Sequence, residues 1–116
     1  LMSERGVVMM TTVDTDEQVE TLCSVLLEER LAACIQAMPV VSRYRWQGEV
    51  QRDAETLLLI KTTADAADAA IRVIESYHDY DTPEVVVLPI TGGLPAYLQW
   101  LETETRATPP PDDGDA

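Results

Sequence analysis

A two-residue turn between two long β-rich stretches constrains this chain more than any other feature. Residues 34–61 run as one extended stretch, the pair Gln47-Gly48, and a second extended stretch that ends in Leu57-Leu58-Leu59-Ile60-Lys61. Glycine tolerates the positive φ that two-residue hairpin turns require. The sequence therefore predicts a two-stranded antiparallel ribbon whose turn is Gln47-Gly48.

A loop this short also fixes which residues face each other across the ribbon. The predicted pairs are Trp46 with Glu49, Tyr44 with Gln51, Ser42 with Asp53, and Val40 with Glu55. Because side chains alternate between the two faces of a strand, Tyr44, Trp46, Glu49, Asp53 and Glu55 should share one face. A bulge would shift the later pairs, so the position of Glu55 depends most on regular pairing.

The length of the ribbon predicts that its tip overhangs the rest of the domain. Each arm has about 13 residues, which extend roughly 40 Å at about 3.3 Å per residue. A domain of this size has a radius of gyration of only about 13 Å. An isolated two-stranded ribbon is marginally stable in water. We therefore expect the ribbon to pack on neighbouring copies of the chain.

Composition limits the class of partner. The 116 residues suit one domain, and 21 acidic residues against eight basic ones give a net charge of −13. Such a chain repels nucleic acid phosphates and anionic lipids, so we expect neither nucleic acid nor membrane as a partner. Divalent cations are the natural counterpart. A solvated acidic surface, as in a salt-rich cytoplasm, also explains the charge, so acidity alone does not indicate a metal binder.

The location and cysteine chemistry follow from what the sequence contains. No signal peptide is recognisable, and the apolar runs are far shorter than the roughly 20 residues of a membrane-spanning helix. The two cysteines, Cys23 and Cys34, lack C-x-x-C spacing and predict no disulfide framework or zinc site. These features favour a cytoplasmic protein.

Hydrophobic periodicity predicts the element order βαββαβ followed by a last helix. A strand is expected over 7–13, followed by a helix from the N-cap Thr15, with Gln18 in capping-box spacing, to about Ala33. After the ribbon, a second helix is capped by Thr62 or Thr63 and ends near Tyr77, and a loop covers 78–84. A strand over 85–90, with Pro89 at an edge, and a helix from Pro95 complete the order. This order predicts an α+β fold, a ferredoxin-like sandwich with helices on one face of an antiparallel sheet. Residues 1–6 are expected to be a flexible N-terminus, 7–105 the folded domain, and 106–116 a disordered acidic and Pro-rich tail.

Five short motifs, in order and at matching spacing, resemble the CutA divalent-cation tolerance family over about residues 7–104. They are Arg30-Leu31-Ala32-Ala33-Cys34, Ser42-x-Tyr44-x-Trp46-x-Gly48-x-Val50, Glu55-x-x-Leu58-x-Ile60-Lys61-Thr62, His78-x-Tyr80-x-x-Pro83-Glu84 and Tyr97-Leu98-x-Trp100. The resemblance implies a ferredoxin-like trimer, related in architecture to the PII signalling proteins, whose hairpins wrap neighbouring subunits. It also implies a part in divalent-ion tolerance, with copper binding in some members.

The chain departs from the family at the positions described as copper ligands. Copper-binding bacterial members are described with a cysteine at the end of the first strand and a His-His pair in the later loop. Those positions align with Thr11, Tyr77 and His78, and Asp79 replaces the usual proline. One of the three proposed ligands is therefore retained.

The metal-binding candidates are His78, Cys34, Asp79, Asp81 and Glu84. His78 is the only histidine, and with the nearby acids it suits Cu²⁺ or another divalent ion. A histidine favoured by the negative end of a helix dipole is an alternative interpretation. Cys34 is a soft copper ligand if exposed as a thiolate, or a packing residue if buried. Cys23, Met9 and Met10 are predicted to fill the core.

Aromatic and polar residues of the motifs predict a second kind of site. Together they make an expected interface or pocket cluster of Tyr44, Trp46, Glu55, Lys61, Tyr80, Pro83, Tyr97 and Trp100. A small-molecule pocket between subunits is one interpretation, and a set of interface anchors is the other, because Trp and Tyr are enriched at interfaces with or without a ligand.

Taken with this resemblance, the sequence leads us to expect a homotrimer that responds to divalent metal ions, with weak copper(II) binding and no required cofactor. No nucleophile–base motif, Walker A motif or zinc-hydrolase motif is present, so a non-enzymatic role is expected. The alternatives are a PII-like trimeric signalling module that binds a small effector between subunits, and a structural trimerising scaffold.

Overall fold

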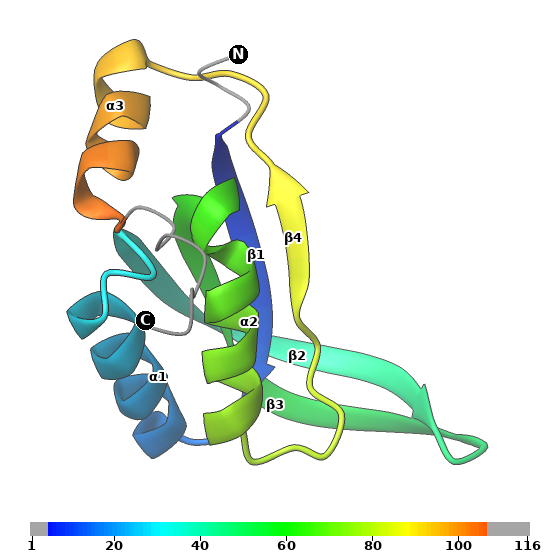
Figure 1. Cartoon of the computed structure of the whole chain (residues 1–116). Helices are drawn as coiled ribbons and strands as arrows, with labels where there is room; N and C mark the ends of the chain where they lie inside the picture. Colours follow the sequence, from blue (N-terminus) through cyan, green and yellow to red (C-terminus); the bar gives the residue numbers. More distant parts are fainter. Residues whose placement is uncertain (1–4, 107–116) are drawn as a thin grey trace.

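The computed structural model describes residues 5–106 and consists of one four-stranded antiparallel sheet with three helices (Figure 1). In chain order the elements are β1 (Gly6–Val13), α1 (Asp16–Glu28), β2 (Cys34–Trp46), β3 (Glu49–Thr63), α2 (Ala64–Tyr77), β4 (Val86–Pro89) and α3 (Pro95–Glu104). The strands are ordered β2-β3-β1-β4. The predicted α+β class and element order are confirmed. The greater part of the predicted tail, 107–116, and residues 1–4 lie outside the described residues.

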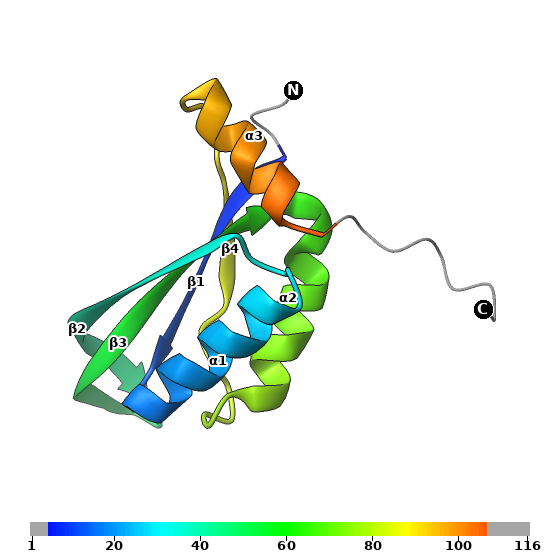
Figure 2. The same cartoon turned by 90° about the vertical axis from the view of Figure 1, so that its left-hand side faces the viewer.

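The core lies between the sheet and the two longer helices. Figure 2 shows α1 and α2 side by side on one face of the sheet. The side chains that fill this layer are almost fully buried: Met9, Val13, Leu58 and Ile60 from the strands, and Leu22, Leu26, Ala70 and Ile74 from the helices. Met9 is therefore core, as predicted, whereas Met10 is half-buried on the opposite face, and Cys23 is half-buried. No helix within residues 5–106 combines the length and apolar character needed to cross a membrane.

Helix α1 begins as predicted but ends earlier. The Thr15 hydroxyl accepts the Gln18 N–H at 3.1 Å, which confirms the N-cap. The expected continuation to about Ala33 is wrong, because the helix ends at Glu28. Arg30 adopts a left-handed φ of 57°, and the Leu31 N–H bonds the Leu26 carbonyl at 2.9 Å. This is a left-handed helix termination without the glycine that usually marks it in a sequence.

The remaining boundaries agree to within a few residues. Helix α2 follows Thr63, which makes no side-chain cap bond, while Thr62 belongs to β3 and its hydroxyl donates to the Leu31 carbonyl at 2.7 Å. Strand β4 is shorter than the predicted 85–90 and pairs only with β1. Pro89, which cannot donate to a ladder, therefore lies on an edge strand, as expected.

The ribbon has the predicted register throughout. Strands β2 and β3 pair from Trp46↔Glu49 to Cys34↔Lys61 without a bulge. Gln47 and Gly48 both have positive φ, 53° and 82°, which is typical of a type I′ turn. Figure 1 shows the ribbon extending past the helices, so the predicted overhang is confirmed.

Candidate functional site

The loop after α2 is held to the end of β1 by the His78 ring. Its Nε2 lies 2.9 Å from the Thr12 carbonyl oxygen, and its Nδ1 accepts the Tyr80 N–H at 3.1 Å. Because Nδ1 is an acceptor here, the ring proton is assigned to Nε2, which donates to Thr12. Both nitrogens are therefore engaged by the backbone, and a metal ion must displace one of these bonds to bind the imidazole.

A glutamine that was predicted only as a cap fixes the same loop. The Gln18 side chain donates to the Tyr77 carbonyl at 3.0 Å and accepts the Asp79 N–H at 3.0 Å. It is only 7% exposed. The sequence feature that indicates this role is the spacing: Gln18 lies four residues before the buried Leu22, so its amide is on the buried face of α1. Such a buried amide must find backbone partners.

Tyrosines and carboxylates form a polar cluster on the neighbouring face of the ribbon. The Tyr80 hydroxyl donates to Glu55 at 2.6 Å, and the Tyr44 hydroxyl donates to Asp53. The Tyr80 ring also lies 4.8 Å, centroid to centroid, from the His78 ring. Burial, and then the bond to Glu55, raise the pKa of Tyr80. The pKa of Tyr44 is raised chiefly by its hydrogen bond to Asp53.

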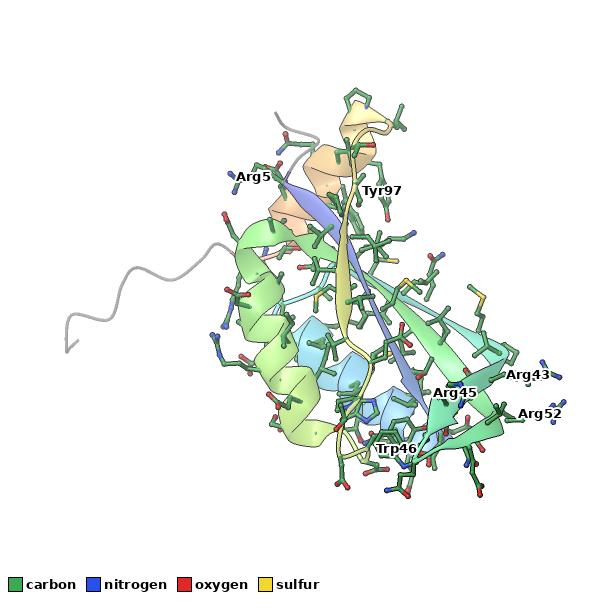
Figure 3. All side chains as sticks on the ribbon, turned by 90° about the vertical axis from the view of Figure 1, so that its right-hand side faces the viewer. Arg5, Arg43, Arg45, Trp46, Arg52 and Tyr97 are labelled. Carbon is green, nitrogen blue, oxygen red and sulfur yellow. The ribbon has the colours of Figure 1, made fainter. Side chains whose placement is uncertain are left out.

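A second aromatic cluster lies at the other end of β3. The Lys61 Nζ is 5.8 Å from the centroid of the Tyr97 ring, and the Tyr97 and Trp100 rings are 5.6 Å apart. Lys61 and Glu55 are six positions apart along β3, which corresponds to roughly 20 Å. Within one chain the interface or pocket cluster expected from the sequence is thus two clusters. Trp46 is near the ribbon tip, 48% exposed (Figure 3), and Pro83 is half-buried in the loop.

The metal-binding candidates are not gathered in one place. Cys34 is half-buried and lies opposite Lys61, which in turn lies opposite Val8 of β1. His78 instead contacts Thr12. Val8 and Thr12 are four residues apart on β1, so the two candidates are separated by about 13 Å along the strand. Asp79, Asp81 and Glu84 are exposed in the loop.

The position aligned with the family cysteine does not add a ligand. The Thr11 side chain is fully buried on the helix-covered face, and its hydroxyl has no hydrogen-bond partner. Over residues 5–106, no three His, Cys, Asp or Glu side chains are grouped so that they would hold a metal ion. Within residues 5–106, a single chain therefore does not present a ready-made set of three ligands.

Comparison with known sequences gives one consistent family. Residues 7–104 match the family model described as CutA1 divalent ion tolerance protein. The divalent-cation tolerance protein CutA of Thermus thermophilus is 46% identical over 99 residues, covering 84% of this chain and 96% of that protein. The chloroplastic CutA 1 of Oryza sativa is 44% identical over 102 residues, 87% of this chain. This chain spans only 58% of the length of the rice protein and 56% of the chloroplastic CutA of Arabidopsis thaliana.

Solved structures agree with the sequence comparison. CutA1 from Oryza sativa superposes with a TM-score of 0.85 at 41% identity, covering 91% of this chain and 98% of that one. The Thermus thermophilus structure gives a TM-score of 0.84 at 44% identity, with coverages of 87% and 99%. A structure from Archaeoglobus fulgidus, whose description calls it periplasmic, gives a TM-score of 0.84 at 27% identity.

Proposed function

The chain belongs to the CutA1 divalent ion tolerance family, and we propose that it acts in divalent-cation tolerance as a homotrimer with a ferredoxin-like subunit. The observation that carries the proposal is the overhanging ribbon. Tyr44 and Trp46, on its outer half, are 41% and 48% exposed in the single chain. Large aromatic side chains gathered on one face are typical of protein interfaces. The subunit number follows the family architecture.

The open face of the sheet supports self-association independently. This face, opposite the helices, is largely apolar. Met10, Leu57 and Leu59 are half-buried on it, and Met38, Val86 and Leu88 are 42–44% exposed. The two outer strands, β2 and β4, each pair on one side only. Exposed apolar faces and open edges are features that stable proteins cover.

Light scattering on the full chain, with Trp46→Ala beside it, tests the assembly. We expect a trimer mass for the native chain and a smaller species for the variant under the same conditions. The control is Val50→Ala, which removes an exposed apolar side chain from the opposite face of the same ribbon and should leave the mass unchanged. A native chain that remains a monomer at every accessible concentration would contradict the proposal.

Copper(II) binding is proposed to be weak and centred on His78, with exposed acids of the loop such as Asp79 nearby. The weakness has a structural reason: the imidazole already makes two backbone hydrogen bonds, so binding must break one of them. Borderline nitrogen and hard oxygen ligands suit Cu²⁺.

Calorimetric titration of the full chain with Cu²⁺, beside His78→Gln, tests this site. Glutamine retains an amide N–H that can donate to Thr12 but lacks the imidazole ligand. We expect a weak site in the native chain that the variant loses. Equal heats for both proteins would place any copper on the general acidic surface and exclude His78 as its ligand.

A second candidate function is a trimeric signalling module that binds a small effector between subunits. The Lys61–Tyr97–Trp100 cluster favours it, because a cation beside two exposed rings can hold an anionic, planar ligand. A nucleotide panel screened by thermal shift, with Lys61→Met as control, would reveal it as a Lys61-dependent stabilisation.

If neither metal nor nucleotide shifts the melting temperature, the structural scaffold becomes the favoured function. In each case we propose a non-enzymatic role, and the cytoplasm as the location.

A further inference from the structure

The two faces of the ribbon carry opposite charge. One face bears Glu49, Asp53 and Glu55, whereas Arg43, Arg45 and Arg52 lie on the other, together with Val41, Val50 and Ala54. Three of the eight basic residues of a chain with 21 acids are therefore collected on one short surface with no acidic side chain between them. We call these six residues the arginine face.

The arginines are close together and lack partners among residues 5–106. Arg43 lies directly opposite Arg52, and Arg45 is two residues from Arg43 on the same strand. Directly opposite residues have Cβ atoms about 5 Å apart, and like charges in that position destabilise the pair. All three side chains are exposed, and within the described part of the chain none of the three guanidinium groups has a hydrogen bond or ion pair. Figure 3 shows Arg43 and Arg52 side by side, pointing away from the ribbon.

The arginine face is turned away from the surface proposed for self-association. Arg52, Leu58 and Ile60 are alternate residues of β3 and therefore share one face of the sheet. Because Leu58 and Ile60 pack under the helices, the arginine face continues the helix-covered side. Tyr44 and Trp46 are on the other side. A trimer built through the open sheet face and the aromatic side of the ribbon thus leaves the arginines free at its exterior.

From these observations we propose that the arginine face is a docking surface for an acidic protein segment. The positive charge matches carboxylates, which arginine binds in bidentate fashion. Val41 and Val50, which are 49% and 68% exposed, flank the charges, and arginine beside apolar contact area is typical of protein interfaces. At physiological salt, charges beyond about 8 Å are screened, so the local face outweighs the net charge of −13 for a short segment. A long polyanion such as nucleic acid meets the acidic remainder of the surface as well.

Fluorescence anisotropy tests the docking surface. The probe is a short fluorescein-labelled peptide rich in glutamate with two separated leucines, added to the full chain at physiological salt. The comparison peptide has glutamine in place of every glutamate. We expect only the acidic peptide to bind, and the Arg52→Gln variant to weaken binding about fivefold. The matched control is Arg72→Gln, an exposed arginine of α2, which should bind as the native chain does. The triple variant Arg43→Gln, Arg45→Gln, Arg52→Gln should bind no peptide.

Three results would overturn the inference. Equal binding by the native chain and the triple variant would show that the arginines are not the contact. Arginine-dependent binding of tripolyphosphate or single-stranded DNA, without binding of the peptide, would identify a phosphate site instead. A change of mass in light scattering for the triple variant would show that the arginines hold a second copy of the chain. Because the Gln variants remove like-charge repulsion, they should fold at least as stably as the native chain, so loss of peptide binding would not reflect unfolding.

Discussion

The two halves of the β2–β3 ribbon follow the same local rules and have opposite surroundings. Both halves pair in one continuous register, with side chains alternating between faces. In the inner half, Leu58 and Ile60 are fully buried beneath the helices. In the outer half, Val50 is 68% exposed and Tyr44 is 41% exposed. The core holds the inner half. An isolated two-stranded ribbon is marginally stable in water, so we propose that contacts with neighbouring copies of the chain hold the outer half.

The largest difference between the halves should appear on truncating one side chain in each. Ile60→Ala creates a cavity in a fully buried site and should lower the free energy of unfolding by about 3 kcal/mol. Val50→Ala, the matched change at the exposed tip, should stay within about 0.5 kcal/mol. Urea denaturation at one fixed protein concentration measures both. Similar losses for the two variants would mean that the tip is packed as tightly as the core.

The outer half should instead control assembly. Trp46→Ala removes a large anchor and should weaken self-association by about 2 kcal/mol or more, the range of interface hot spots. Its effect on the unfolding of the isolated subunit should be small, because Trp46 makes no core contact. Sedimentation velocity over a dilution series gives the association constant, with Val50→Ala as the variant that should match the native chain.

The turn that joins the halves offers changes of opposite sign. Gly48 has a φ of 82° and nothing within 4 Å of where a Cβ would stand, so Gly48→Ala costs backbone strain alone, about 1 kcal/mol. Gln47 also lies in the left-handed region, at a φ of 53°. Asparagine is favoured there, so Gln47→Asn should stabilise by a few tenths of a kcal/mol. Thermal denaturation of both variants tests the turn, and a loss of stability in Gln47→Asn would contradict the turn assignment.

A modest, pH-dependent effect is expected where the loop meets the ribbon. Tyr80→Phe removes the hydroxyl bond to Glu55 and should cost about 0.5–1 kcal/mol near neutral pH. The pKa of Tyr80 is raised in the folded chain, whereas an unfolded tyrosine titrates near 10. Above about pH 10 the unfolded state loses this proton while the folded state keeps it, so stability falls with rising pH. The native chain should therefore approach Tyr80→Phe in stability as the pH rises past 10. A difference that stays constant up to pH 11 would contradict this role.

Much of the fold was predictable because a two-residue turn leaves only one register. From Gln47-Gly48, the alternation placed Tyr44, Asp53 and Glu55 on one face, and the structure confirms it. The end of α1 was not predictable in the same way. Arginine carries no signal for a left-handed conformation, and Arg30 is stabilised there by bonds from its guanidinium group to the distant Thr103 and Glu104 carbonyls.

The candidate site was predicted less completely, because its geometry depends on contacts between distant segments. The sequence identifies His78 but cannot show that Thr12 and the Tyr80 N–H occupy both ring nitrogens. Likewise, Glu55 and Lys61 belong to one motif, yet the length of strand between them places them in separate clusters. Gln18 is predicted from the sequence only as part of a capping box, whereas in the structure its buried side chain bridges α1 to the loop after α2.

Hydrogen exchange along the ribbon tests most directly the claim that neighbouring copies hold its outer half. We expect backbone amides in the paired residues 40–46 and 49–55 to be protected as well as those of residues 57–62 when the native chain is concentrated. In Trp46→Ala, at a concentration where it is monomeric, the outer amides should exchange rapidly while the inner ones stay protected. Outer amides that remain fully protected in a monomer would contradict the account, because the ribbon would then be stable without a neighbour.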